Sequence, residues 1–151
     1  LRGYALYQQH CAQCHRGPLF TDHDFHHIGY PRAAPKATDD HEPGRARHVP
    51  IGLKELRLFG AYRTPSLRNL PRTSPYFHAS PESDPEVARI SLMRAVEFYD
   101  ARVFVTPYLA DPLRANGDAR RLHLSLKDRE SLVLFLTALD GTPIDPILTA
   151  R

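Results

Sequence analysis

Apolar residues recur at helical spacing in several parts of the chain. Residues 1–14 place leucine and tyrosine among glutamine and histidine without any proline, which predicts a short amphipathic helix. Residues 92–100 repeat the pattern, and Ser91 directly before them is the expected N-cap. A shorter helix is predicted over residues 53–59, where Gly60 would end it.

The last helix has the strongest pattern. Ser125 is a suitable N-cap, and Asp128 three residues later completes a capping-box arrangement. Gly141 and Pro143 are expected to end the helix. Three leucines line one face of it: Leu132, Leu136 and Leu139. We expect this face to pack against the first helix, next to any group that is bound there.

Prolines divide these helical segments. The chain of 151 residues contains 14 prolines, many of them within residues 31–50 and 71–85. Such stretches exclude long helices, so much of the middle of the chain is expected to be ordered loop. A length of 151 residues suits one domain, residues 1–151. The predicted fold class is therefore all-α with long ordered loops, and a bound cofactor would help to organise so many loops.

Charge and hydropathy exclude two classes of partner. The formal net charge is +3, and its arginines are scattered rather than gathered in one tract. A nucleic-acid-binding domain would more often show a concentrated basic stripe. The sequence also contains no run of 18 or more apolar residues, so no membrane span is predicted.

Residues 11–15 read Cys-Ala-Gln-Cys-His and carry the main chemical signal. On a helical turn, Cys11 and Cys14 lie on one side and can each form a thioether with one vinyl group of a haem. His15 then projects its imidazole at the iron. The pattern predicts one covalently attached haem c. Covalent attachment of this kind implies a periplasmic, extracytoplasmic location in a bacterium.

Other interpretations of the motif account for fewer residues. A structural zinc site wants four protein ligands, and the chain has no second cysteine pair, so a distant histidine would have to complete it. A thioredoxin-like redox pair would follow a strand, whereas the preceding segment is predicted to be helical. A disulfide alone would leave His15 without a role.

With this motif placed, the chain resembles the C-terminal haem domain of the bacterial di-haem cytochrome c peroxidases and the related MauG-type enzymes. The haem motif is the specific match, and the others carry weight through their common order. The matching segments cover most of the chain: Cys11-Ala-Gln-Cys-His15, Gly17-Pro18, Phe20-Thr-Asp22, Phe25-His-His-Ile-Gly29, Gly44-Arg45, Arg63-Thr-Pro-Ser-Leu-Arg-Asn69, Thr73-Ser-Pro-Tyr-Phe-His78, Ala95-Val-Glu-Phe-Tyr99, Leu132-Val-Leu-Phe-Leu136, Leu139 and Gly141.

The resemblance implies a cytochrome c-like domain that carries the six-coordinate electron-transfer haem of a di-haem oxidoreductase, and no catalytic acid or base for peroxide cleavage. Peroxide would react at a second haem, on an N-terminal domain or a partner chain, and a redox partner protein is also implied. The sequence would then be a fragment, a processed enzyme or one subunit. The alternative is a stand-alone mono-haem cytochrome c that carries electrons between partners.

The second axial ligand has three candidates: Met93, His78 and Tyr99. A methionine would raise the reduction potential and suit simple electron transfer. The resembled peroxidases place their methionine where Tyr99 stands, and MauG-type enzymes place a tyrosine there. The resemblance therefore favours Tyr99. On one helix, Met93 and Tyr99 would point roughly opposite ways, because they are six residues apart.

The resemblance also implies a calcium ion between the two domains. Backbone carbonyls of Thr73 and Pro75 would be two of its ligands, and hard oxygen donors suit this cation. The alternative is a turn stiffened by Pro75. Arg45 and Arg68 are candidates to bind the haem propionates, since buried carboxylates favour bidentate partners. Either could equally be an ordinary surface arginine.

Overall fold

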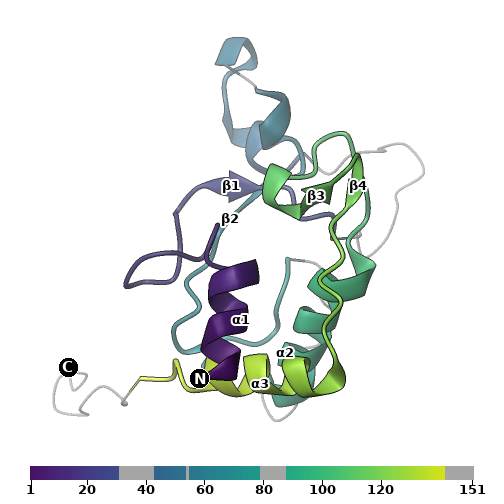
Figure 1. Cartoon of the computed structure of the whole chain (residues 1–151). Helices are drawn as coiled ribbons and strands as arrows, with labels where there is room; N and C mark the ends of the chain where they lie inside the picture. Colours follow the sequence, from purple (N-terminus) through teal and green to yellow (C-terminus); the bar gives the residue numbers. More distant parts are fainter. Residues whose placement is uncertain (31–42, 54, 79–87, 142–151) are drawn as a thin grey trace, which may run out of the picture.

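The computed structural model of the chain describes residues 1–30, 43–53, 55–78 and 88–141. Within these ranges three α-helices are present, α1 (Arg2–His10), α2 (Ala88–Glu97) and α3 (Leu126–Thr137). In Figure 1, α3 runs along the base of the molecule, and α1 and α2 stand against different parts of it. No helix of the described residues is long and apolar enough to cross a membrane.

Helices α1 and α3 pack closely, as expected from their apolar faces. A Cβ atom added at Gly3 would lie 2.0 Å from the carbonyl oxygen of Ser131, so the approach of the two backbones requires glycine there. One turn later, the ring centroids of Tyr7 and Phe135 are 5.1 Å apart. These contacts fix the end of α1, and with it the residues that follow.

The main core lies where the three helices meet. Leu132 and Leu136 of α3 are buried there, as the pattern predicts, while Leu139 lies just beyond the helix and is half-buried. Burial of a leucine side chain of this kind contributes about 1.5–3 kcal/mol. The buried members of this core are Tyr7, Leu70, Leu92, Val96, Leu124, Leu132, Val133 and Leu136.

A second, smaller core lies beyond the end of α2. There the backbone passes from α-helix into a π-helical turn, η6 (Phe98–Arg102), which carries Tyr99. Turns of this type are rare and often occur at functional sites. The buried members of the second core are Phe98, Val103, Leu109 and Ala119, with Tyr30, Phe77 and Tyr99 packed against them.

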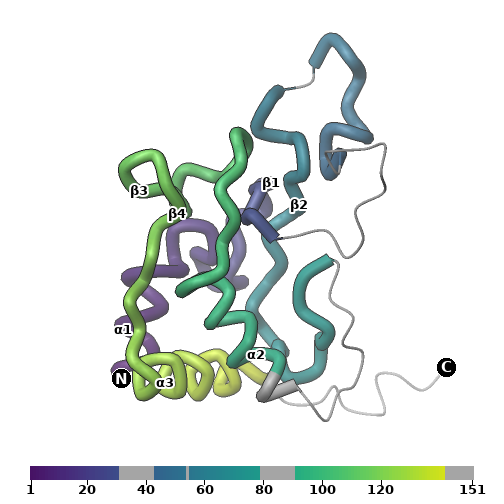
Figure 2. The backbone as a smooth tube through the Cα atoms, turned by 90° about the vertical axis from the view of Figure 1, so that its right-hand side faces the viewer, coloured from purple at the N-terminus to yellow at the C-terminus, as the bar shows by residue number. Residues whose placement is uncertain are grey.

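Short strands and 3₁₀ turns form the rest of the described chain. Strand β1 (Phe25–His26) pairs antiparallel with β2 (Tyr62–Arg63), and β3 (Arg114–Ala115) pairs antiparallel with β4 (Asp118–Ala119). Figure 2 shows the segment after residue 43 extending away from the helices. The all-α expectation is thus met by the helices but omits these two strand pairs. The 3₁₀ turns are Gly44–His48, Ile51–Leu53, Leu56–Leu58, Leu70–Arg72 and Asp111–Leu113.

The predicted helix ends have different outcomes. The capping box is confirmed, because Ser125 Oγ accepts from the Asp128 N–H at 3.2 Å and the Asp128 carboxylate accepts from the Ser125 N–H at 3.3 Å. The N-cap role of Ser91 is wrong, since α2 already begins at Ala88. The helix predicted over residues 53–59 is also wrong: two separate 3₁₀ turns occupy this region. Pro143 lies outside the described residues.

Candidate functional site

The Cys-x-x-Cys-His motif continues directly from α1. The Cys11 N–H donates to the Tyr7 carbonyl oxygen at 2.8 Å, and the His15 N–H donates to the Cys11 carbonyl oxygen at 3.0 Å. The Tyr7 hydroxyl donates in turn to the His15 carbonyl oxygen. These bonds hold the motif in tight turns whose position is set by the packing of α1 on α3.

Both cysteines are free and half-buried. Burial raises the pKa of the Cys11 thiol to about 12 and that of the Cys14 thiol to about 11. At neutral pH both groups are therefore neutral thiols. Attack on a disulfide requires the thiolate, so the environment of this pair does not favour a redox-active pair.

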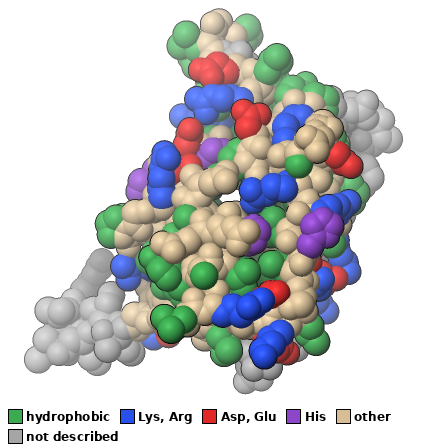
Figure 3. Space-filling model, in the orientation of Figure 1, with side chains coloured by type: hydrophobic (Ala, Val, Ile, Leu, Met, Phe, Trp, Pro, Cys, Tyr) green, Lys and Arg blue, Asp and Glu red, His purple; other side chains and the backbone are tan. Residues whose placement is uncertain are grey.

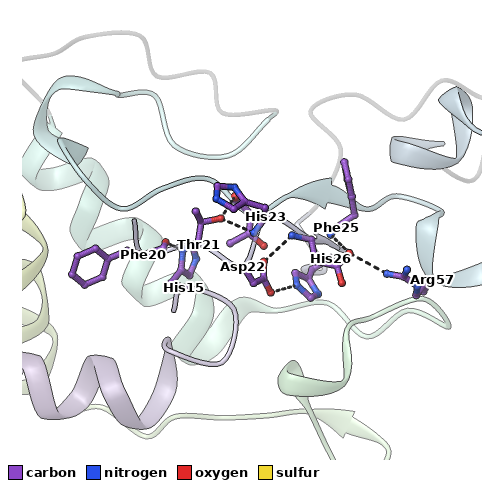
Figure 4. A network of polar contacts seen from close by, with 10 residues as sticks. His15, Phe20, Thr21, Asp22, His23, Phe25, His26 and Arg57 are labelled. Atoms are coloured by element: carbon purple, nitrogen blue, oxygen red, sulfur yellow. Dashed lines mark hydrogen bonds and ion pairs between the residues drawn. The ribbon is translucent and has the colours of Figure 1, made fainter. Parts of the chain in front are cut away.

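The His15 ring is held by backbone oxygens. Its Nδ1 lies 3.1 Å from the Phe20 carbonyl oxygen, and the Pro65 carbonyl is near enough to raise the pKa of the ring. Figure 4 shows His15 and Phe20 in this part of the chain. Burial lowers the pKa of His15, although these carbonyls oppose the shift, so the neutral ring is favoured. A proton on Nδ1 donated to a carbonyl leaves the lone pair on Nε2 available to a metal.

Tyr99 lies close to the motif in space. Burial raises the pKa of its phenol well above the usual range, and the Cys11 and Cys14 thiols add to the shift. The phenol therefore lies within electrostatic reach of both cysteines. Its ring packs on Phe98 and Phe77, with centroid separations of 5.3 and 5.9 Å.

The two other candidate ligands occupy different surroundings. Met93 is half-buried and packs against the main core, whereas Tyr99 packs against the second core. His78 is exposed, and its ring stacks on Tyr62 with a centroid separation of 3.9 Å.

Comparison with known proteins gives a consistent set of relatives. No protein-family model matches the chain. The methylamine utilization protein MauG of Methylorubrum extorquens is 32% identical over 144 residues, which cover 94% of this chain and 35% of that protein. The cytochrome-c peroxidase IdrP1 of Pseudomonas sp. (strain SCT) is 30% identical over 169 residues, which cover 97% of this chain and 41% of that protein. Over nearly its whole length, the chain is similar to cytochrome c peroxidases and MauG proteins.

A solved structure agrees at the level of the fold. The crystal structure of a MauG-like protein associated with microbial copper homeostasis superposes with a TM-score of 0.59 and 21% sequence identity. The match covers 93% of this chain and 46% of that one. The chain thus spans less than half the length of the relatives it matches.

A covalently attached haem fits the residues at this site. Two free, half-buried thiols lie one turn apart, and the next residue has a ring whose Nε2 is available. In addition, the phenol of the half-buried Tyr99 is within electrostatic reach of the cysteine pair. Cys11, Cys14 and His15 follow α1, and Tyr99 lies in the π-helical turn after α2. Both α1 and α2 pack against α3.

The arginines predicted to bind propionates are both exposed. The guanidinium of Arg45 lies 4.8 Å from the centroid of the Phe25 ring. Arg68 donates from Nε to the Pro18 carbonyl oxygen at 2.7 Å. Neither forms an ion pair with a carboxylate among the described residues. The sequence did not single out Arg120, whose side chain reaches the residue before Cys11 and whose partners are described below.

The segment implied in calcium binding forms a tight turn. Tyr76 donates from its hydroxyl to the Leu70 carbonyl oxygen at 2.8 Å, and the Thr73 hydroxyl donates to the same oxygen at 3.2 Å. In the described part of the chain, no N–H donates to the carbonyls of Thr73 or Pro75. These oxygens remain predicted ligands.

A further group of metal-binding residue types surrounds Cys14. Ligand atoms of Cys14, Asp22 and His26 all lie within 4.8 Å of one another, and His26 Nε2 is 2.9 Å from Asp22 Oδ2 (Figure 4). A thioether on Cys14 would exclude thiolate binding of a metal there. The His26–Asp22 contact then holds together the loop that supplies the Phe20 carbonyl.

Proposed function

We propose that this chain is the C-terminal haem domain of a di-haem, MauG-like oxidoreductase, with one haem c on Cys11 and Cys14. The observation that supports this most is the His15 ring, which the Phe20 carbonyl holds with Nε2 available for an axial bond. The share of the relatives that the chain spans supports a further domain or partner chain. The peroxide-reacting haem would be located there.

The residues of this chain would have distinct roles. The bound haem supplies one-electron redox chemistry. Cys11 and Cys14 would hold it, and His15 would bind the iron from one side. Tyr99 would supply its phenolate oxygen from the other side, since a bound metal lowers the pKa of an oxygen ligand. Such a hard, anionic donor favours the oxidised state and suits storage of oxidising equivalents better than simple electron carriage.

The wider surroundings are proposed on the same basis. Thr73 and Pro75 would contribute carbonyl oxygens to a calcium ion at the interface with the second haem domain. Arg45 and Arg68 remain candidates for haem carboxylates. A redox partner protein would exchange electrons with the enzyme, and covalent haem attachment supports a periplasmic location in a bacterium.

The proposal can be tested on the chain produced in a bacterial host that attaches haem c. Anaerobic titration should take up one electron per chain reversibly. Because peroxide chemistry is assigned to the other haem, the isolated chain should not turn over hydrogen peroxide when supplied with a reduced electron donor. Sustained peroxide turnover by this chain alone would contradict the proposed division of labour.

The same titration distinguishes the stand-alone carrier. A high potential together with the weak near-infrared band of His–Met ligation would favour a mono-haem electron carrier. A low potential without that band supports the MauG-like assignment.

A further inference from the structure

Arg120 directly follows strand β4, and its side chain turns toward the end of α1. Its N–H donates to the Leu113 carbonyl oxygen at 2.8 Å, which anchors the backbone. One terminal nitrogen, Nη2, donates to the His10 carbonyl oxygen at 3.3 Å. The Nε atom is buried and has no hydrogen-bond partner among the described residues.

Several other arginines in the described part of the chain have an acidic partner. Arg129 lies 2.8 Å from a carboxylate oxygen of the buried Asp100, and exposed Arg72 pairs with Asp140 at 2.7 Å. Arg120 forms no ion pair with any residue that the structure describes. A buried guanidinium donor without a partner is costly, so an anion from outside the described residues is expected at this position.

Arg120 lies near the cysteine pair. His10, whose carbonyl it contacts, is the residue immediately before Cys11. The positive charge of Arg120 also lowers the pKa of both Cys11 and Cys14, in opposition to the larger effect of burial. The guanidinium is therefore within electrostatic reach of the two cysteines that the proposed function assigns to haem attachment.

We propose that Arg120 binds a carboxylate group of the haem attached at Cys11 and Cys14. This inference rests on the proposed haem, whose propionates are the carboxylates brought to this site. A guanidinium matches a carboxylate with parallel N–H donors, and Nε is the donor left over in this structure. The bond would position the haem and place a fixed positive charge beside it.

The test compares the midpoint reduction potential of the haem-loaded wild type with that of Arg120→Gln. A cation close to the haem disfavours the ferric state, which carries the higher positive charge. Its removal should lower the potential by about 59 mV, equivalent to a tenfold change in the one-electron equilibrium. The matched control is Arg121→Gln, which removes the same charge from an exposed neighbour and should leave the potential unchanged. Equal potentials in the two variants would overturn the proposal.

Two further variants keep the test decisive if Arg120→Gln does not accumulate as haem-loaded protein. Arg120→Met fills similar space without a polar atom to satisfy, and it should show the same fall in potential. If both neutral variants fail to accumulate while Arg120→Lys does accumulate, a cation is required and the proposal stands. If none of the three Arg120 variants accumulates as haem-loaded protein while Arg121→Gln does, the role of Arg120 is structural and the proposal is overturned. Intact mass of the wild type is measured first, because a chain without haem would refute the proposed function itself.

Discussion

The Nδ1 atom of His15 lies 3.1 Å from the carbonyl oxygen of Phe20, and the Pro65 carbonyl is near enough to raise the pKa of the same ring. These two carbonyls come from segments far apart in the sequence, so the fold and not the motif alone fixes the orientation of the imidazole. A ring held at Nδ1 can offer only Nε2 to a metal. The next question is which residue would supply the second ligand of the proposed haem iron, opposite His15 Nε2.

Tyr99→Phe tests which residue stands there. The substitution removes only the phenolic oxygen from a ring that Phe98 and Phe77 support, so the fold and haem content should persist. Loss of an oxygen ligand should change the ferric absorption spectrum to that of a five-coordinate or water-bound form. Ultraviolet–visible and electron paramagnetic resonance spectra of the ferric protein measure this change.

Met93→Leu is the matched comparison for Tyr99→Phe. Met93 packs against the main core, and leucine has a similar volume, so the substitution should cost less than about 1.5 kcal/mol. Its ferric spectrum should equal that of the wild type. If instead Met93→Leu changes the spectrum and Tyr99→Phe does not, the assignment of Tyr99 as an iron ligand is wrong. The result would then favour an ordinary electron carrier.

Leu136→Asp tests the helix packing that supports the motif. Leu136 is 7% exposed in the core between α3 and its neighbours, so an aspartate there would bury an unpaired charge at a cost of several kcal/mol. Haem-loaded protein should fail to accumulate. Leu134→Asp is the control on the same helix, where the side chain is 65% exposed, and its yield should be normal. Equal yields of the two variants would refute this packing.

Asp128 should make the protein sensitive to acid. Hydrogen bonds from Arg2 and Ser125 lower the pKa of its carboxyl to about 2. Because this value is below that of an unfolded carboxyl, the charged group stabilises the fold at neutral pH. That contribution is lost as the pH falls from about 4 towards 2. The thermal midpoint of Asp128→Asn should therefore lie below that of the wild type at pH 6.

The difference between Asp128→Asn and the wild type should shrink at lower pH. Glu130→Gln, at an exposed position of the same helix, is expected to leave the midpoint nearly unchanged at both pH values. A constant difference between Asp128→Asn and the wild type from pH 6 to pH 2 would show that the charge of Asp128 is not the stabilising feature.

Local patterns could be predicted from the sequence. The Ser125–Asp128 capping box depends on residues three apart, and the sequence identified it correctly. The Cys11–His15 spacing is equally local. Ser91 was misinterpreted because the local sequence does not distinguish a serine inside a helix from a serine at its N-cap. Only the structure shows that α2 begins at Ala88.

Features that depend on distant contacts were not predictable. The π-helical turn around Tyr99 has no known sequence signal, and the nearness of Tyr99 to the cysteines was suggested by the family resemblance alone. Arg120 is one of many scattered arginines, and its role emerges only when β4 is brought beside α1. The two strand pairs are two residues long, too short for an alternating pattern to be recognised.

Covalent attachment of one haem through Cys11 and Cys14 is the central claim, and intact mass spectrometry tests it most directly. The protein from a host that attaches haem c should have the mass of the chain plus one haem, retained after acid–acetone extraction. The double variant Cys11→Ser/Cys14→Ser should have the mass of the bare chain. A wild-type mass equal to that of the bare chain, or haem lost on extraction, would contradict the account.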